Sequence, residues 1–135
     1  MQRTILLLAI SALSLSCLGD AERLPPPLPR DGTALPYSQV LTRLSAQTNA
    51  AKEEHFLNHW DALVDVSLTL EQSAGYLLKS PDLPPTHKVQ IEKTVGDLNV
   101  NILRLREAGR RKDQTESLEM IRRIHNEIRE LQELK

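Results

Sequence analysis

The sequence predicts an all-α protein, an up-down-up-down four-helix bundle that follows an N-terminal export signal and a proline-rich linker. Three observations predict this class. From residue 37 to the end of the 135-residue chain, apolar residues recur with the 3.6-residue period of a helix. Prolines divide this part of the chain into segments of helix length. Aromatic residues make up only 3% of the chain, so the core depends on aliphatic side chains, which suits the packing of helix against helix.

Residues 1–17 resemble an export signal of the lipoprotein type. Arg3 precedes an uncharged apolar run that is too short to span a bilayer as a mature helix. Cys17 ends this run after "LSLS", which is similar to a bacterial lipobox, although Ser14 stands where Leu is more usual. The pattern predicts a periplasmic or membrane-anchored lipoprotein of a bacterial envelope, with the lipid on Cys17. Cleavage by signal peptidase I nearby, for instance after Gly19, is the alternative.

Residues 18–36 form a linker with five prolines among nineteen residues. Such a stretch cannot hold a helix and tends toward an extended polyproline II conformation. We interpret it as a spacer between the membrane and the folded domain, residues 37–135. The alternative is a ligand for a proline-binding module.

Two helices are expected first in the folded domain, at about 37–56 and 59–79. Their apolar stripes are Tyr37, Leu41, Leu44, Thr48 and Ala51, and Trp60, Leu63, Ser67, Leu70, Ala74 and Leu77. The two stripes differ in phase by about one residue, or roughly 100° of rotation. Asn58 also resembles an N-cap with Asp61 three residues further on. The chain is therefore expected to break near Leu57, and one long bent helix is the alternative.

Two further helices are expected at about 84–108 and 113–134. Their apolar stripes are Ile91, Val95, Leu98, Ile102 and Leu105, and Leu118, Ile121, Ile124, Ile128 and Leu131. Pro84 suits the first turn of the third helix, and Gly109 is expected to end it. The fourth helix is expected to begin at Asp113 or Thr115.

The composition argues against several classes of function. The formal net charge of −1 provides no field to steer a polyanion, so no nucleic-acid partner is expected. Cys17 is the single cysteine, which excludes an intramolecular disulfide and a C-x-x-C motif. The sequence also lacks a glycine-rich phosphate loop, a nucleophile elbow and an H-E-x-x-H motif, and we expect no enzyme.

The segment "LREAGRRKDQTESLEMIRRIHNEIREL", together with the export signal and four helices, resembles the periplasmic four-helix cytochromes, cytochrome c′ and its b-type relatives. The resemblance covers residues 37–135. Members of the c type attach haem through C-x-x-C-H near the end of the last helix, and b-type members keep the histidine. Here those places fall near Ile128 and Leu131, and the first helix lacks the axial methionine of the b-type members. The resemblance therefore implies a haem-free member with a lost haem site and no cofactor.

Three histidines are candidates for chemistry. His55 and His59 in "HFLNH" are four residues apart, a spacing with which a continuous helix can hold Zn, Ni or Cu, and Glu54 and Asp61 could add carboxylate ligands. The expected helix break falls inside this motif, so a surface or helix-junction role is the other interpretation. His125 lies beside the apolar stripe of the last helix. We expect it to be structural, and non-covalent haem ligation is the alternative.

The sequence thus predicts a non-enzymatic, exported, envelope-anchored bundle with an interaction or structural role. The expected partners are the membrane, through Cys17, and an unidentified protein. Val100 and Leu103 lie outside the main apolar stripe and would allow a homodimer. A periplasmic metal-binding or metal-sensing bundle that uses His55 and His59 is the alternative function.

A basic cluster marks the end of the third helix. Its members are Arg104, Arg106, Arg110, Arg111 and Lys112. We interpret the cluster as solvated charge that complements the negative end of the helix dipole. Docking on anionic lipid headgroups is the alternative.

Overall fold

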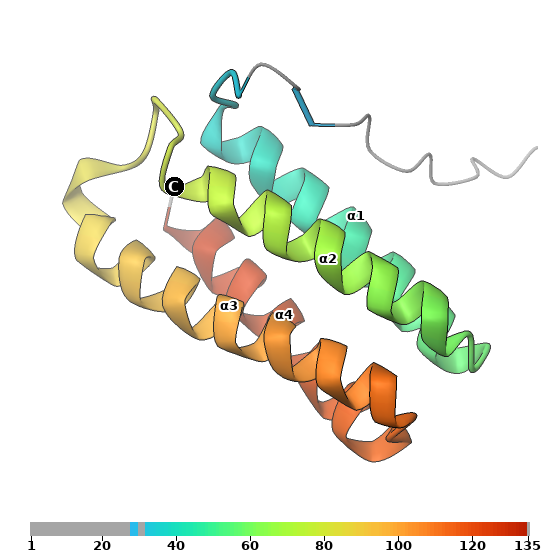
Figure 1. Cartoon of the computed structure of the whole chain (residues 1–135). Helices are drawn as coiled ribbons and strands as arrows, with labels where there is room; N and C mark the ends of the chain where they lie inside the picture. The colour runs from blue at the N-terminus through green and yellow to red at the C-terminus, as the bar shows by residue number, and fades with distance from the viewer. Residues whose placement is uncertain (1–27, 30–31, 135) are drawn as a thin grey trace, which may run out of the picture.

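A computed structural model of the chain describes residues 28–29 and 32–134. The predicted signal, Cys17 and most of the linker lie outside the described residues. The described part contains four α-helices, namely α1 (Tyr37–Phe56), α2 (Trp60–Leu77), α3 (Lys88–Arg111) and α4 (Gln114–Glu133) (Figure 1). A short 3₁₀ helix, η1 (Pro85–His87), precedes α3. This part of the chain has no strand, and the predicted all-α fold is confirmed.

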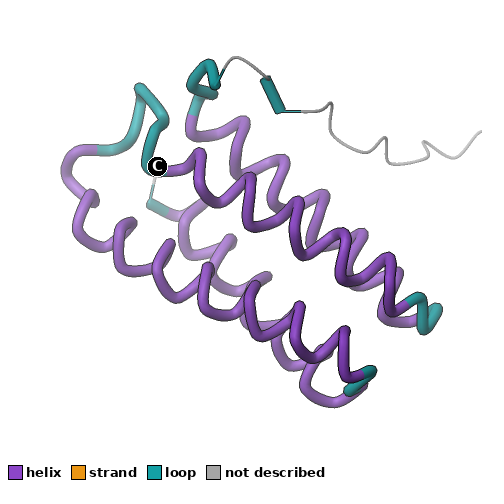
Figure 2. Tube along the Cα trace, viewed as in Figure 1, coloured by secondary structure: helices purple, strands orange, loops and turns teal. Residues whose placement is uncertain are grey.

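Consecutive helices run in opposite directions and are joined at the ends of the bundle by residues 57–59, 78–87 and 112–113 (Figure 2). Helix contacts run from α1 to α2, to α3, to α4 and back to α1. The four helices therefore surround one core in an up-down-up-down bundle, as predicted. Within the described ranges, no helix combines the length and apolar character needed to cross a bilayer.

The core consists of aliphatic side chains from all four helices. The predicted stripe of α3, from Ile91 to Leu105, is buried completely or nearly so. In α4 the first predicted stripe residue, Leu118, is only half buried, and Ser117 and Met120 take the buried positions of the first turns instead. Each large aliphatic side chain removed from water contributes about 1.5–3 kcal/mol, which makes this core the main source of stability.

The chain breaks between α1 and α2 as predicted, but the reason differs. Asn58 was expected to cap α2, and this expectation was wrong. The backbone of Asn58 has a positive φ of 56° and forms the turn that ends α1. In this turn the N–H of Asn58 donates to the carbonyl of His55 at 3.1 Å, and the N–H of His59 donates to the carbonyl of Glu54 at 2.9 Å. These two bonds satisfy carbonyls that the last helical turn leaves free. The side-chain oxygen of Asn58 accepts a bond from Gln114, at the start of α4.

The end of α3 shows the same turn, and the expectation that Gly109 ends the helix was also wrong. The left-handed residue is Lys112, with a φ of 57°, and the N–H of Asp113 bonds to the carbonyl of Ala108 at 2.9 Å. Gly109 is buried against α2, where an added Cβ would lie 3.1 Å from a methyl group of Val64. The absence of a side chain at Gly109 allows α2 and α3 to pack closely together.

Two aspartates cap helix starts. Asp113 precedes α4, which begins at Gln114, between the two expected starts, and the Asp113 carboxylate accepts a bond from the N–H of Glu116 at 2.9 Å. Asp82 lies in the connection between α2 and α3, and its carboxylate accepts from the N–H of Tyr37, the first residue of α1, at 2.7 Å. The second bond joins segments that are far apart in the sequence, so it stabilises the bundle end as well as α1.

Candidate functional site

His55 is a buried residue of α1 that connects this helix to α4. Its Nδ1 lies 2.9 Å from the hydroxyl of Ser117, and that hydroxyl donates to the carbonyl of Gln114 at 3.2 Å. The imidazole Nδ1–H is therefore the donor toward Ser117. The ring also meets Phe56 and Trp60 edge-on, and burial lowers the pKa of His55. These contacts describe a neutral histidine at a helix junction.

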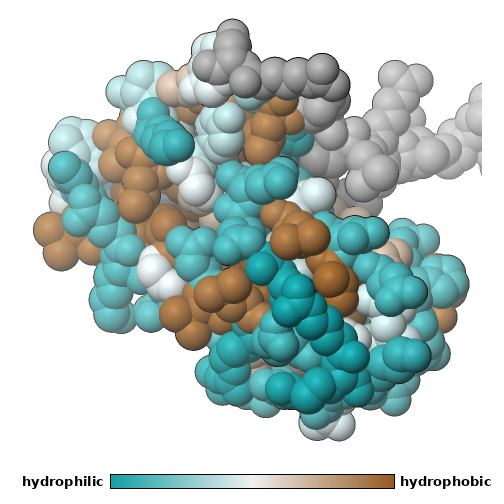
Figure 3. Space-filling view, viewed as in Figure 1, coloured by the Kyte–Doolittle hydropathy of each residue, from teal (hydrophilic) through white to brown (hydrophobic). Residues whose placement is uncertain are grey.

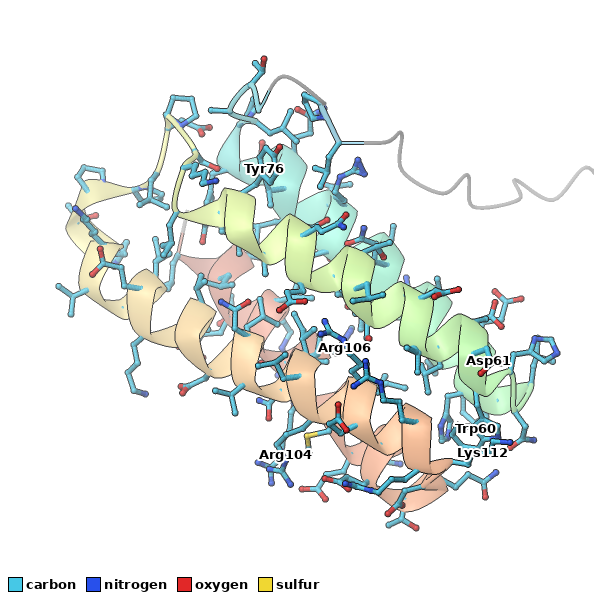
Figure 4. The ribbon with its side chains drawn as sticks, in the orientation of Figure 1. Trp60, Asp61, Tyr76, Arg104, Arg106 and Lys112 are labelled. Carbon is cyan, nitrogen blue, oxygen red and sulfur yellow. The ribbon has the colours of Figure 1, made fainter. Side chains whose placement is uncertain are left out.

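His59 lies beyond the end of α1, and its imidazole is exposed to solvent. Its Nδ1 is 2.9 Å from a carboxylate oxygen of Glu54. Since α1 ends at Phe56, His55 and His59 do not share the face of a continuous helix, and they have different partners. The described residues contain no group of three or more His, Cys, Asp and Glu side chains that could hold a metal. Asp61 lies at the same end of the bundle, near Trp60 and Lys112 (Figure 4).

The end of α4 is the place that the cytochrome resemblance would assign to haem attachment. Ile128 is 3% exposed and Leu131 is fully buried in the core. The hydroxyl of Tyr37 donates to the carbonyl of Leu131 at 3.1 Å, and burial raises the pKa of Tyr37 to about 12. Apolar side chains packed in this way supply no iron ligand, so the residues present here do not fit a haem.

The basic residues at the end of α3 do not form a single patch. Each of the four arginines has an acidic partner. The pairs are Arg104 and Arg111 with Glu116, Arg106 with Glu71, and Arg110 with Glu107. Arg106 lies between α2 and α3, whereas Arg104 points away toward α4 (Figure 4). This neutralisation favours the interpretation as solvated and paired charge.

A groove lies between the second half of α1 and residues 118–126 of α4. We name it the α1–α4 groove. It is lined by Thr48, Asn49, Lys52, Phe56, Leu118, Ile121, Arg122, His125 and Asn126. Spacings of three and four residues place the lining residues on the facing sides of the two helices. A second hollow, which contains His55 and Glu119, adjoins it and shares Phe56, Leu118 and Arg122.

The α1–α4 groove has an apolar floor. Ile121 is buried in the core and Leu118 is half buried. Phe56, in the last turn of α1, remains 62% exposed, which is unusual for the only phenylalanine of the chain. An exposed aromatic ring beside a concave apolar surface is typical of a contact site.

The rim of the groove carries two cationic side chains, Lys52 and Arg122, beside His125. Within the described residues neither Lys52 nor Arg122 is paired with a carboxylate. The nearest lining carboxylate, Glu119 of the adjoining hollow, is bonded to Arg123 at 2.5 Å. An apolar floor with unpaired cations is complementary to a ligand that is apolar and acidic.

The sequence interpretation placed His125 beside the core of α4 but did not find this groove. His125 is exposed on the groove wall. Phe56 does not belong to the apolar stripe of its helix, and this position alone indicated in the sequence that its ring could be exposed. No pattern in the sequence indicates that Lys52 of α1 and Arg122 of α4 line the same groove.

Comparisons with protein-family models, with curated proteins and with solved structures found no match for this chain. The resemblance to cytochrome c′ therefore stays a prediction.

Proposed function

We propose that the protein is a non-enzymatic, exported binding module of a bacterial envelope, which holds an acidic, apolar segment of a partner protein in the α1–α4 groove. In this proposal it is a haem-free relative of the four-helix cytochromes. The observation that carries the proposal is the exposed Phe56 beside Lys52 and Arg122, which lack acidic partners among the described residues. The packing of Ile128 and Leu131 in the core supports the absence of a haem.

The test is a fluorescence titration of the full chain with 8-anilinonaphthalene-1-sulfonate, a probe that combines an aromatic body with an anionic group. We expect saturable binding that weakens about tenfold, or about 1.4 kcal/mol, in Lys52→Glu. Phe56→Ser should weaken binding as well, because it removes the aromatic contact. Lys79→Glu is the matched control, since it makes the same charge change at the opposite end of the bundle. Equal affinities for Lys52→Glu and Lys79→Glu would show that the groove is not the site.

The anchor in the envelope is the second part of the proposal and rests on Cys17. A lipid at this residue would fix the start of the linker to the membrane surface. The full chain should then sediment with membranes, and Cys17→Ala should release it into the soluble fraction. If the parent chain and Cys17→Ala are both found in the soluble fraction, cleavage by signal peptidase I is favoured instead.

One observation favours the metal-binding alternative. Glu54 holds Nδ1 of His59 at 2.9 Å, which resembles the carboxylate–histidine pairs that orient metal ligands and leaves Nε2 available. His59 and Asp61 line the same shallow hollow at the bundle end. Stoichiometric Zn, Ni or Cu in the purified chain that is lost in His59→Ala would establish metal binding. A purified chain without metal would favour partner binding in the α1–α4 groove.

A further inference from the structure

The outer face of α3 carries a second heptad-like stripe, opposite the stripe that fills the core. Its members are Val89, Lys93, Gly96, Val100, Leu103 and Glu107, spaced 4-3-4-3-4. All six are exposed, with Val89 at 81%, Val100 at 56% and Leu103 at 46%. Figure 3 shows apolar patches among hydrophilic side chains over α2 and α3 on the face turned toward the viewer. Such a stripe is the pattern of a helix that packs against another helix.

Gly96 lies in the middle of this stripe and gives it a hollow. A Cβ built at Gly96 would meet nothing within 4 Å, so neither α2 nor α4 requires the absence of a side chain there. Glycine inside a helix is otherwise unfavourable relative to alanine. This glycine differs from Gly109, whose close contact with Val64 explains it. The absence of a side chain at Gly96 would allow a second helix to approach α3 closely at this point.

We propose that two copies of the protein pair through the outer faces of their α3 helices, antiparallel, about a two-fold axis at Val100. In this arrangement residues equally far before and after Val100 on the two helices lie at the same height. The two Val100 side chains meet each other. Leu103, three residues after the axis, lies within one residue of Gly96 in the second copy and fills its hollow.

The charges of α3 are complementary in this register. Lys93 and Glu107 lie seven residues before and seven residues after Val100, so each lysine is level with a glutamate of the other copy. Asp97 and Arg104 differ in height by one residue, about 1.5 Å, and lie on the same flank of the stripe. The two-fold axis places like flanks together, so Asp97 of one copy is nearly level with Arg104 of the other, and Arg104 can reach it by leaving its exposed bond to Glu116. Each contact occurs twice by symmetry.

A second flank repeats the pattern. Glu92 and Arg110 lie eight residues before and ten residues after Val100, a difference in height of about 3 Å that their long side chains span. In a parallel pair of α3 helices the central charges Lys93 and Glu107 would each face their own copy instead. The charge order along α3 therefore favours the antiparallel pair.

Each of these six charges already has a partner within the chain, and for Arg104 and Glu92 the partners are Glu116 and Lys88. Lys93 lies 3.7 Å from Asp97, with 81% and 59% of their side chains exposed, and Glu107 is bonded to Arg110. Exposed pairs of this kind are weak, and their solvated side chains can add a partner from the second copy. The interface shares no residue with the α1–α4 groove, because every residue that lines the groove belongs to α1 or α4. This inference is thus independent of the proposed function.

Disulfide trapping of the full chain tests the pairing. Val100→Cys places the new thiols at the axis, and mild oxidation should give a covalent dimer on a non-reducing gel. Gly75→Cys, at an exposed position of α2 with open space around it, should not. The chain with the natural Val100 controls for disulfides formed by Cys17.

Charge exchange tests the register in the Val100→Cys background. Lys93→Glu and Glu107→Lys each bring like charges together twice, and each should lower the dimer yield about tenfold, equivalent to about 1.4 kcal/mol. The double variant restores opposite charges and should restore the yield. Far-UV circular dichroism checks that every variant keeps its helices. A yield from Gly75→Cys equal to that from Val100→Cys, or a double variant that stays low, would overturn the proposal.

Discussion

Glu127 is a half-buried carboxyl group of α4 whose ionisation affects the stability of the bundle. One carboxylate oxygen accepts a bond from the amide of Asn101 at 2.5 Å, and the other is buried without a partner among the described residues. Burial raises the pKa of Glu127 from 4.5 to about 7, although the bond from Asn101 acts in the opposite direction. The folded chain thus favours the protonated acid. Its contribution to stability is fully present below pH 4.5 and is lost as the pH rises from 4.5 to 7.

We therefore expect Glu127→Gln to stabilise the protein at pH 8 and to have little effect at pH 4. The amide keeps an oxygen for Asn101 and carries no charge, and the gain at pH 8 should be about 1 kcal/mol, or an increase in Tm of about 4–8 °C. Thermal unfolding followed by circular dichroism from pH 4 to pH 8 measures it. Glu133→Gln makes the same change at an exposed position of α4 and is the control. A difference between Glu127→Gln and the parent that does not vary with pH would contradict this interpretation.

The pH dependence of His55 has the opposite sign. Burial lowers the pKa of His55, so the unfolded chain binds the proton more readily. The stability that neutral His55 contributes is present above its ordinary pKa of 6.5 and is lost as the pH falls below it. Comparison of the Glu127 variant with its parent removes this common contribution.

The ends of α1 and α3 show how far an element could be predicted from the sequence. The apolar stripes predicted four helices because burial follows the helical period, and the stripe of α3 agrees with the structure at every position. The helix ends were harder, since Asn58 and Gly109 were assigned by residue preference alone. In the structure the left-handed positions are Asn58 and Lys112, and the fit of α3 against α2 decides the place of Gly109.

Lys112 tests this account of the α3 end. A side chain in the left-handed region carries a steric cost that glycine avoids, so Lys112→Gly should stabilise the bundle by about 0.5–1 kcal/mol. Urea unfolding measures the change, with Lys112→Ala as the control that removes the side chain but keeps the Cβ. If alanine stabilises as much as glycine, the lysine side chain and not the backbone is responsible.

The candidate site shows what the sequence could not supply. Phe56 and Lys52 belong to α1, and Arg122 and His125 belong to α4, so the groove exists only after these helices pack together. The i,i+4 spacing of His55 and His59 suggested a joint role, but the end of α1 separates them. Spacing predicts proximity only while the helix continues, and packing between helices decides the rest.

At the scale of the whole molecule, the α1–α4 groove lies toward the end of the bundle remote from Tyr37, the first residue of α1. The linker joins α1 at Tyr37, and the groove lies along the second half of this 20-residue helix, which is about 30 Å long. The C-terminus lies at the same end of the bundle as the start of α1 (Figure 1).

Photo-crosslinking in the cell envelope tests this account most directly. The full chain carries p-benzoylphenylalanine in place of Asn49, an exposed residue of the α1–α4 groove, or in place of Gln72, an exposed residue of α2. The account predicts a discrete protein adduct from position 49 that is absent from position 72 and is lost when Lys52→Glu is added. Equal adducts from both positions, or an adduct from position 49 that Lys52→Glu leaves unchanged, would contradict recognition of an acidic partner by the groove.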